Sequence, residues 1–118
     1  MEKVISDLII SVGVPVSSRG YWYIREAVLL LSEKSDLIMY ITKNVYPTIA
    51  KKYDTTPCNV EKAIRYSIGK SWEYCISCKR CMEGLAELIE GRKPSNSQFL
   101  WMLCRNLWDK LQETEMGV

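Results

Sequence analysis

The sequence of 118 residues contains no histidine and no long apolar run. Without histidine, general acid–base catalysis would depend on Glu, Asp, Lys, Tyr or Cys. No glycine-rich phosphate loop, nucleophile elbow or paired-acid motif is present to organise those groups, so we expect neither enzyme activity nor a cofactor. No apolar stretch approaches the roughly 20 residues that a membrane-spanning helix needs, and residues 1–16 lack a signal-peptide cleavage pattern. These absences predict a cytoplasmic protein that does not enter the membrane.

The sequence also lacks the even set of cysteines that is typical of a disulfide framework, because it has five. Three of them form the spacing Cys75-x-x-Cys78-x-x-Cys81, at which thiolates can hold zinc or an iron–sulfur cluster. On a helix the same spacing also suits small apolar side chains along one face. We therefore expect no metal, and keep a metal-binding or redox-sensing role of this triplet as an alternative.

The formal net charge of +2 is too small to indicate a partner, but its distribution is uneven. Residues 19–70 contain nine Lys or Arg against five acidic residues, whereas residues 71–118 contain six against seven. The middle of the chain thus carries a net +4 and the last part a net −1. Such a concentration suits a local footprint for a polyanion, although a solvated basic face would have the same composition.

Apolar residues recur with helical spacing, and strand-like alternation is almost absent. The sequence therefore predicts a single domain over residues 1–118, an all-α compact bundle of about six helices. Capping residues, glycines and prolines set the expected limits. The expected segments are about 4–12, 20–32, 37–44, 46–53, 57–72 and 78–90. A turn and cap at Pro94-Ser95-Asn96-Ser97 is expected before a last helix through Leu111.

Residues 46–72 are predicted to form a helix-turn-helix, the second helix of which can enter the major groove of DNA. Thr56 suits an N-cap and Pro57 a first helical position. The second helix has apolar residues on one face (Val60, Ala63, Ile64 and Ile68) and mostly polar residues on the other (Cys58, Asn59, Lys62, Arg65 and Tyr66). These polar types can pair with bases or contact phosphates. An ordinary helical hairpin with solvated polar residues is the alternative.

The sequence resembles the C-terminal effector domain of stage zero sporulation protein A, the response regulator that starts endospore formation. The resemblance covers about residues 10–110, and many short matches occur in the same order. The matching residues are Gly13-Val14-Pro15, Arg19-Gly20-Tyr21, Tyr23, Arg25-Glu26-Ala27, Ile41-Thr42-Lys43, Tyr46-Pro47, Ile49-Ala50-Lys51-Lys52, Thr55-Thr56, Val60-Glu61, Ala63-Ile64-Arg65, Lys93-Pro94, Asn96-Ser97 and Phe99.

The resemblance implies a six-helix domain that binds a short DNA box resembling TGTCGAA. At the position of the family's base-reading arginine this chain has Asn59, and where the family often has histidine it has Tyr66. The family's further contacts fall on Glu61, Lys62 and Arg65, and Arg19 occupies the position of a phosphate contact. We therefore expect a related regulator with an altered target site. The candidate DNA-binding residues are Arg19, Thr56, Cys58, Asn59, Glu61, Lys62, Arg65 and Tyr66.

The resemblance also implies partners: double-stranded DNA, often bound as a homodimer on tandem sites, and the sigma subunit of RNA polymerase. Because 118 residues leave no room for the family's receiver, we expect either a free-standing effector or part of a longer protein. A protein-interaction module without DNA binding, on the same scaffold, is the rival function. Of the four tryptophans (Trp22, Trp72, Trp101 and Trp108), we expect most in the core and Trp108 at an exposed contact.

Overall fold

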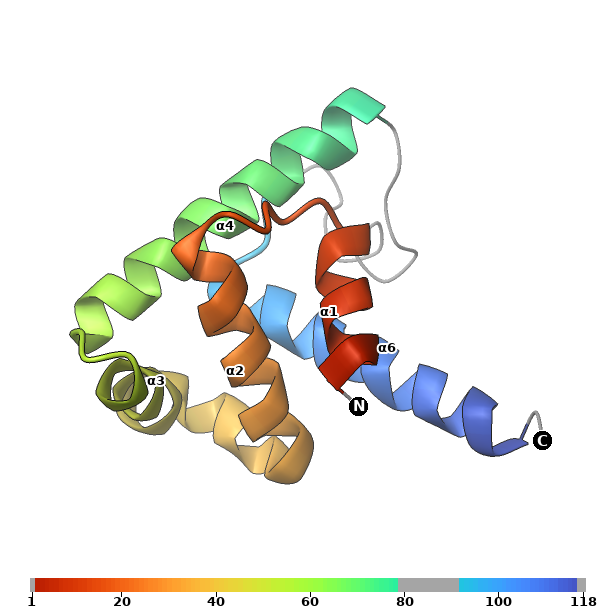
Figure 1. The fold of residues 1–118 in the computed structure, drawn as a ribbon, viewed down its shortest axis with the longest axis horizontal. Coiled ribbons are helices and arrows are strands. Elements are labelled where there is room, and N and C mark those ends of the chain that lie inside the picture. Colours follow the sequence, from red (N-terminus) through yellow and green to blue (C-terminus); the bar gives the residue numbers. More distant parts are fainter. Residues whose placement is uncertain (1, 79–91, 117–118) are drawn as a thin grey trace.

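The computed structural model describes residues 2–78 and 92–116, and within these ranges it has five α-helices and no strand. The helix α2 (Arg19–Glu33) is central and contacts α1 (Glu2–Ser11), α3 (Tyr46–Lys52) and the two long helices, α4 (Pro57–Cys78) and α6 (Asn96–Met116) (Figure 1). The all-α prediction is thus confirmed, with five described α-helices where about six were expected. The helix predicted at 78–90 lies almost entirely outside the described residues.

The segment between α2 and α3 is helical but irregular. It consists of a 3₁₀ helix, η1 (Ser35–Tyr40), followed by a π-helical turn, η2 (Ile41–Val45). The sequence predicted only a short helical segment over 37–44. In η1 no residue is fully buried, whereas Ile41 and Val45 of η2 contribute to the core. The π-helical turn therefore places both apolar side chains on the inner face.

The end of α1 agrees with the prediction and depends on a glycine. Val12 is buried with Ile5 and Ile9 on the inner face of α1, and Gly13 then adopts a left-handed conformation with φ of +87°. A Cβ atom at Gly13 would lie 2.4 Å from the ring of Tyr74. Only glycine therefore allows this turn to approach α4 so closely.

The helix α4 continues beyond Trp72, where the sequence analysis expected it to end. Ser71 and Cys75 are buried on the same face as Ile68, and both side chains donate to the carbonyl oxygen of Val12, at 2.5 and 4.0 Å. A buried serine does not register as a core residue in an apolar pattern, whereas Cys75 fits the small apolar face that the cysteine spacing allows. The added turns of α4 are therefore stabilised by a contact with the distant end of α1.

The start of α6 is fixed by a reciprocal pair of hydrogen bonds. The backbone amide of Gln98 donates to Ser95 Oγ at 3.2 Å, and the amide of Ser95 donates to Gln98 Oε1 at 2.9 Å. This capping box agrees with the turn expected at Pro94-Ser95. The helix runs to Met116 instead of ending at Leu111.

The expectation that most tryptophans lie in the core is wrong. Trp22 and Trp101 are 45% and 40% exposed, and Trp72 and Trp108 are partly buried. The inner face of α6 is filled instead by smaller residues and one phenylalanine, among them Phe99, Leu103 and Leu107. Trp101, and not Trp108, is the more exposed tryptophan of α6, and the two rings pack edge to face at 5.5 Å.

Candidate nucleic-acid interface

A four-residue turn, residues 53–56, joins α3 to α4 and is held to the end of α3. The amides of Tyr53 and Thr55 donate to the carbonyl oxygens of Ile49 and Ala50, at 3.1 and 2.9 Å. Between them Asp54 adopts a left-handed conformation with φ of 52°, which aspartate tolerates better than most residues. These bonds fix the direction in which α4 leaves the turn.

The first turn of α4 has the capping predicted from the sequence. Thr56 Oγ1 accepts a hydrogen bond from the backbone amide of Asn59 at 3.1 Å, and Pro57 is the first helical residue. The side chain of Asn59 is also held, because its Nδ2 donates to Thr55 Oγ1 at 3.2 Å. The exposed amide of Asn59 thus has a defined position on the surface.

The two faces of α4 agree with the prediction. Val60, Ile64 and Ile68 are fully buried, and Ala63 packs against the core while partly exposed. The five residues expected on the outer face are all exposed: Cys58, Asn59, Lys62, Arg65 and Tyr66. Glu61 is half-buried beside them and forms an ion pair with Arg65, one turn further along. The structure therefore brings seven of the eight candidate residues together around the first three turns of α4, counting its cap Thr56.

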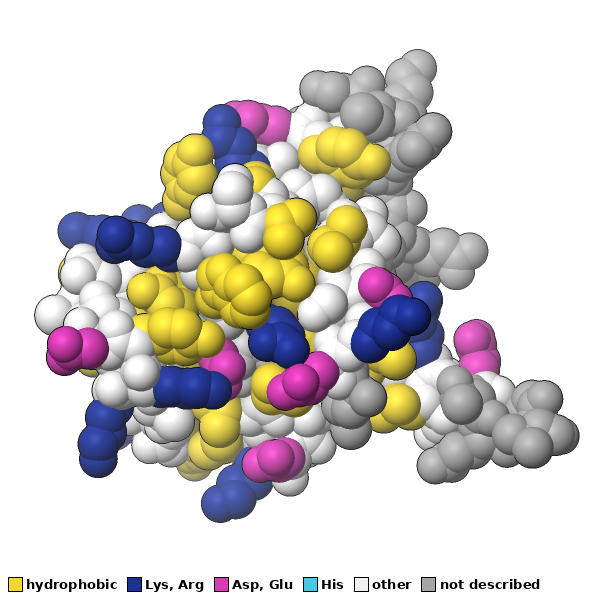
Figure 2. All heavy atoms as spheres, in the orientation of Figure 1, with side chains coloured by type: hydrophobic (Ala, Val, Ile, Leu, Met, Phe, Trp, Pro, Cys, Tyr) yellow, Lys and Arg dark blue, Asp and Glu magenta, His cyan; other side chains and the backbone are white. Residues whose placement is uncertain are grey.

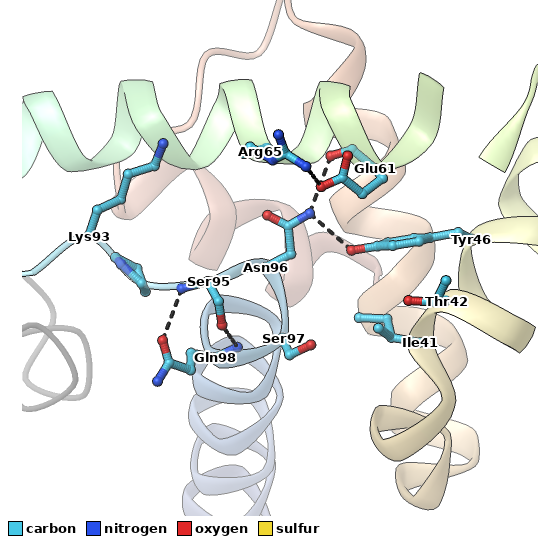
Figure 3. Close-up of a pocket in the computed structure, with 11 residues that line it drawn as sticks. Ile41, Thr42, Tyr46, Glu61, Arg65, Lys93, Ser95, Asn96, Ser97 and Gln98 are labelled. Atoms are coloured by element: carbon cyan, nitrogen blue, oxygen red, sulfur yellow. Dashed lines mark hydrogen bonds and ion pairs between the residues drawn. The ribbon is translucent and has the colours of Figure 1, made fainter. Parts of the chain in front are cut away.

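Asn96, at the start of α6, links this helix to α4 and to the buried Tyr46 of α3 (Figure 3). Asn96 Nδ2 donates to the hydroxyl oxygen of Tyr46 at 2.9 Å and to the backbone oxygen of Glu61 at 3.2 Å. Burial raises the pKa of Tyr46 above its usual value, so the hydroxyl stays protonated. Tyr46, Glu61, Arg65 and Asn96 are among the residues that line a cavity of about 510 Å³. The hydrogen bond from Asn96 holds the backbone of α4 at Glu61, which forms the ion pair with Arg65.

Arg19, the eighth candidate, is exposed at the first position of α2 and lies beside the α3–α4 turn. It lines a second hollow of about 380 Å³ together with Trp22, Tyr53 and Thr55. Figure 2 shows several Lys and Arg side chains at the end of the molecule where α3 and α4 meet. The neighbouring Lys52 forms an ion pair with Glu26, with 2.7 Å between Nζ and Oε1, and this bond raises the pKa of Lys52.

Sequence reasoning missed three exposed residues near this surface: Trp22, Lys70 and Lys93. Trp22 lines the same hollow as Arg19, and Lys70 continues the outer face of α4. Lys70 follows Tyr66 by four residues, so helical spacing could have identified it. Lys93 reaches α4 from a segment distant in the sequence, and no local pattern could have placed it.

The cysteines occupy different environments. Cys58 is exposed near the start of α4, whereas Cys75 and Cys104 are buried. Among residues described by the structure, no three His, Cys, Asp or Glu side chains converge on a possible metal site. Cys81 and the side chain of Cys78 lie outside that set, so the role of the cysteine triplet stays a hypothesis. No helix in the described ranges is long and apolar enough to cross a bilayer.

Comparison with known protein families gives a match over nearly the whole chain. The family model described as "Sporulation initiation factor Spo0A C terminal" matches residues 5–107. This match includes every residue of the surface described above, from Arg19 to Lys93. The family is one of DNA-binding domains and not of enzymes.

Proposed function

Because the chain belongs to the Spo0A C-terminal family of DNA-binding effector domains of sporulation regulators, we propose that it binds duplex DNA sequence-specifically through α4. In this proposal α4 lies in the major groove and α3 crosses the sugar–phosphate backbone, as in other helix-turn-helix proteins. One observation carries the proposal. The outer face of α4 presents a row of exposed hydrogen-bonding side chains, while its inner face is fixed in the core.

Asn59 is the proposed base-reading residue. One hydrogen of its amide is given to Thr55, which leaves the second N–H and the carbonyl oxygen available. These two groups can pair with N7 and the N6 amino group of adenine. An arginine at this position would favour guanine instead, so the target site should differ from the family box at one base pair.

The other candidate residues have supporting roles in the proposal. Lys62 and Arg65 are suited to guanine or phosphate, and Tyr66 to a phosphate or a thymine methyl group. Glu61 pairs with Arg65 and thereby orients its guanidinium group. The start of α4 is surrounded by Arg19, Thr56 and Cys58. We assign Arg19 to a contact with a DNA phosphate.

The test is fluorescence anisotropy of a labelled duplex that carries the family box, beside a scrambled duplex, at two salt concentrations. Sequence-specific binding predicts that the preference for the box persists as salt rises, although both affinities fall. Equal and steeply salt-dependent affinities for the two duplexes would indicate phosphate contacts only at these two sites, and selection from a random library would then follow. The absence of binding to both would favour the interaction module.

One observation favours a protein contact in addition to DNA. Trp101 and Trp108 form an exposed or half-exposed aromatic pair on α6, a residue type enriched in interface hot spots. We propose this pair as a contact for a second copy on tandem sites or for the RNA polymerase sigma subunit, in the cytoplasm. A double variant of Asn59 and Lys62 that no longer binds DNA but still binds such a partner would separate the two functions.

A further inference from the structure

A groove on the outer face of α4 begins at residues already assigned to DNA and continues beyond them. It has a volume of about 430 Å³, and we refer to it as the α4 groove. It is lined by Lys62, Arg65, Tyr66, Gly69, Lys70 and Glu73 of α4 and by Lys93 of the segment that precedes α6. The α4 groove is therefore continuous with the proposed reading surface.

The α4 groove carries a net positive charge. Four cationic side chains line it, and two of them are paired: Arg65 with Glu61, and Lys70 with Glu73, which lies 3.5 Å away in an exposed and hence weak ion pair. The ammonium group of Lys70 also lies 5.6 Å from the ring centre of Tyr66. Among the described residues, no carboxylate forms an ion pair with Lys62 or Lys93. The groove therefore presents positive charge that the described part of the protein does not neutralise.

Lys93 is positioned against α4 by its surroundings. The next residue, Pro94, is buried, and the capped start of α6 follows directly. A Cβ atom at Gly69 would lie 3.4 Å from Lys93 Nζ, so the lysine side chain lies over the one residue of that helix turn without a side chain. Figure 3 shows Lys93 pointing toward α4 from this segment.

We propose that the α4 groove binds the phosphates of one strand of the same duplex that α4 reads, with Lys70 and Lys93 as the new contacts. This inference rests on the proposed function. Asn59 and Lys70 are separated by about 16 Å along the helix at 1.5 Å per residue, whereas the major groove is about 12 Å wide. With Asn59 at the bases, Lys70 reaches the phosphates that border the groove, and Lys93 extends the contact.

The test compares the salt dependence of DNA binding by the wild-type protein and by a double variant, Lys70→Gln with Lys93→Gln. Each lost phosphate contact should reduce the slope of log K against log salt by about one, so the double variant should lose about two. Its affinity should fall by the same factor for the family box and for a scrambled duplex, since phosphates carry no sequence information. The matched control replaces two exposed cations outside the groove, Lys3→Gln with Arg105→Gln.

The outcomes separate this inference from the proposed function. A shallower slope in the groove variant alone, with thermal melts unchanged, supports the phosphate contact. If wild-type protein reads the box but both double variants keep its slope, the groove proposal is wrong and the function of α4 stands. If the two double variants lose slope equally, the effect is one of net charge, and the groove proposal is also wrong. If wild-type protein binds no duplex, both proposals fail.

Discussion

At the scale of single residues, burial gives the cysteines different chemistry. Cys104 is 1% exposed on the inner face of α6, and burial raises the pKa of its thiol from 9.0 to about 12. The thiolate is the reactive form of cysteine, so Cys104 should be inert. Cys58 is exposed and is the described cysteine best placed for chemical labelling on the proposed DNA surface.

The raised pKa of Cys104 predicts a loss of stability in alkali. Between pH 9 and 12 the thiol ionises in the unfolded chain but not in the folded one, so unfolding becomes more favourable. The loss is about 1.4 kcal/mol for each pH unit in that range. The free energy of unfolding, measured with urea from pH 8 to 11, should therefore fall less steeply for Cys104→Ala than for the wild type. The variant should nevertheless be less stable than the wild type at pH 8.

Cys58→Ala is the control for this prediction, because it removes a thiol that is exposed in the folded protein. Its free energy of unfolding should fall with pH as steeply as that of the wild type. Burial also raises the pKa of Tyr46, which acts in the same direction above pH 10, so the difference between the variants is the informative quantity. Equal declines in Cys104→Ala and wild type would contradict the prediction.

At the scale of helices, the crossing of α2 and α4 determines where the proposed DNA-reading surface lies. Gly20 is buried at this crossing, and a Cβ atom there would lie 1.9 Å from Ser67 Oγ and 2.3 Å from the backbone oxygen of Ala63. The backbone oxygen cannot move away without displacing α4. Gly20 therefore allows the two helices to approach, and it also keeps Arg19 beside the α3–α4 turn.

Replacement of Gly20 by alanine should destabilise the protein by about 1–3 kcal/mol, the usual cost of overpacking. Gly69→Ala is the matched control, since Gly69 lies in α4 and its Cβ would meet only the end of the flexible Lys93 side chain, at 3.4 Å. It should stabilise the protein by about 0.5–1 kcal/mol through helix propensity. Urea unfolding measures both values, and a neutral Gly20→Ala variant would contradict this account of the crossing.

The starts of the helices were predictable and some of their ends were not. Thr56 and Ser95 cap their helices through bonds to residues three positions away, so the signal is local. The helix α4 continues past Trp72, where Ser71 and Cys75 bond to Val12 about sixty residues earlier in the chain. The π-helical turn η2 also has no local sequence signal.

At the scale of the whole molecule, the order of the described α-helices followed from the sequence, but their mutual contacts did not. The apolar spacing of α4 predicted its buried face and therefore also the side chains on its exposed face. For this reason most of the candidate residues could be named from the sequence. The bond from Asn96 to Glu61 and the approach of Lys93 to Gly69 join segments far apart in sequence. Composition could locate the excess of positive charge in residues 19–70. Only the fold shows that Lys93 lies beside the cationic side chains of α4.

In the proposed function, α4 reads DNA sequence and Asn59 sets part of that sequence. The most direct test is selection from a library of random duplexes, with wild-type protein and Asn59→Arg in parallel. We expect each protein to enrich one defined site. The two sites should agree except at a single base pair, with adenine preferred by wild type and guanine by the variant. The same site enriched by both proteins, or none by either, would contradict this proposal.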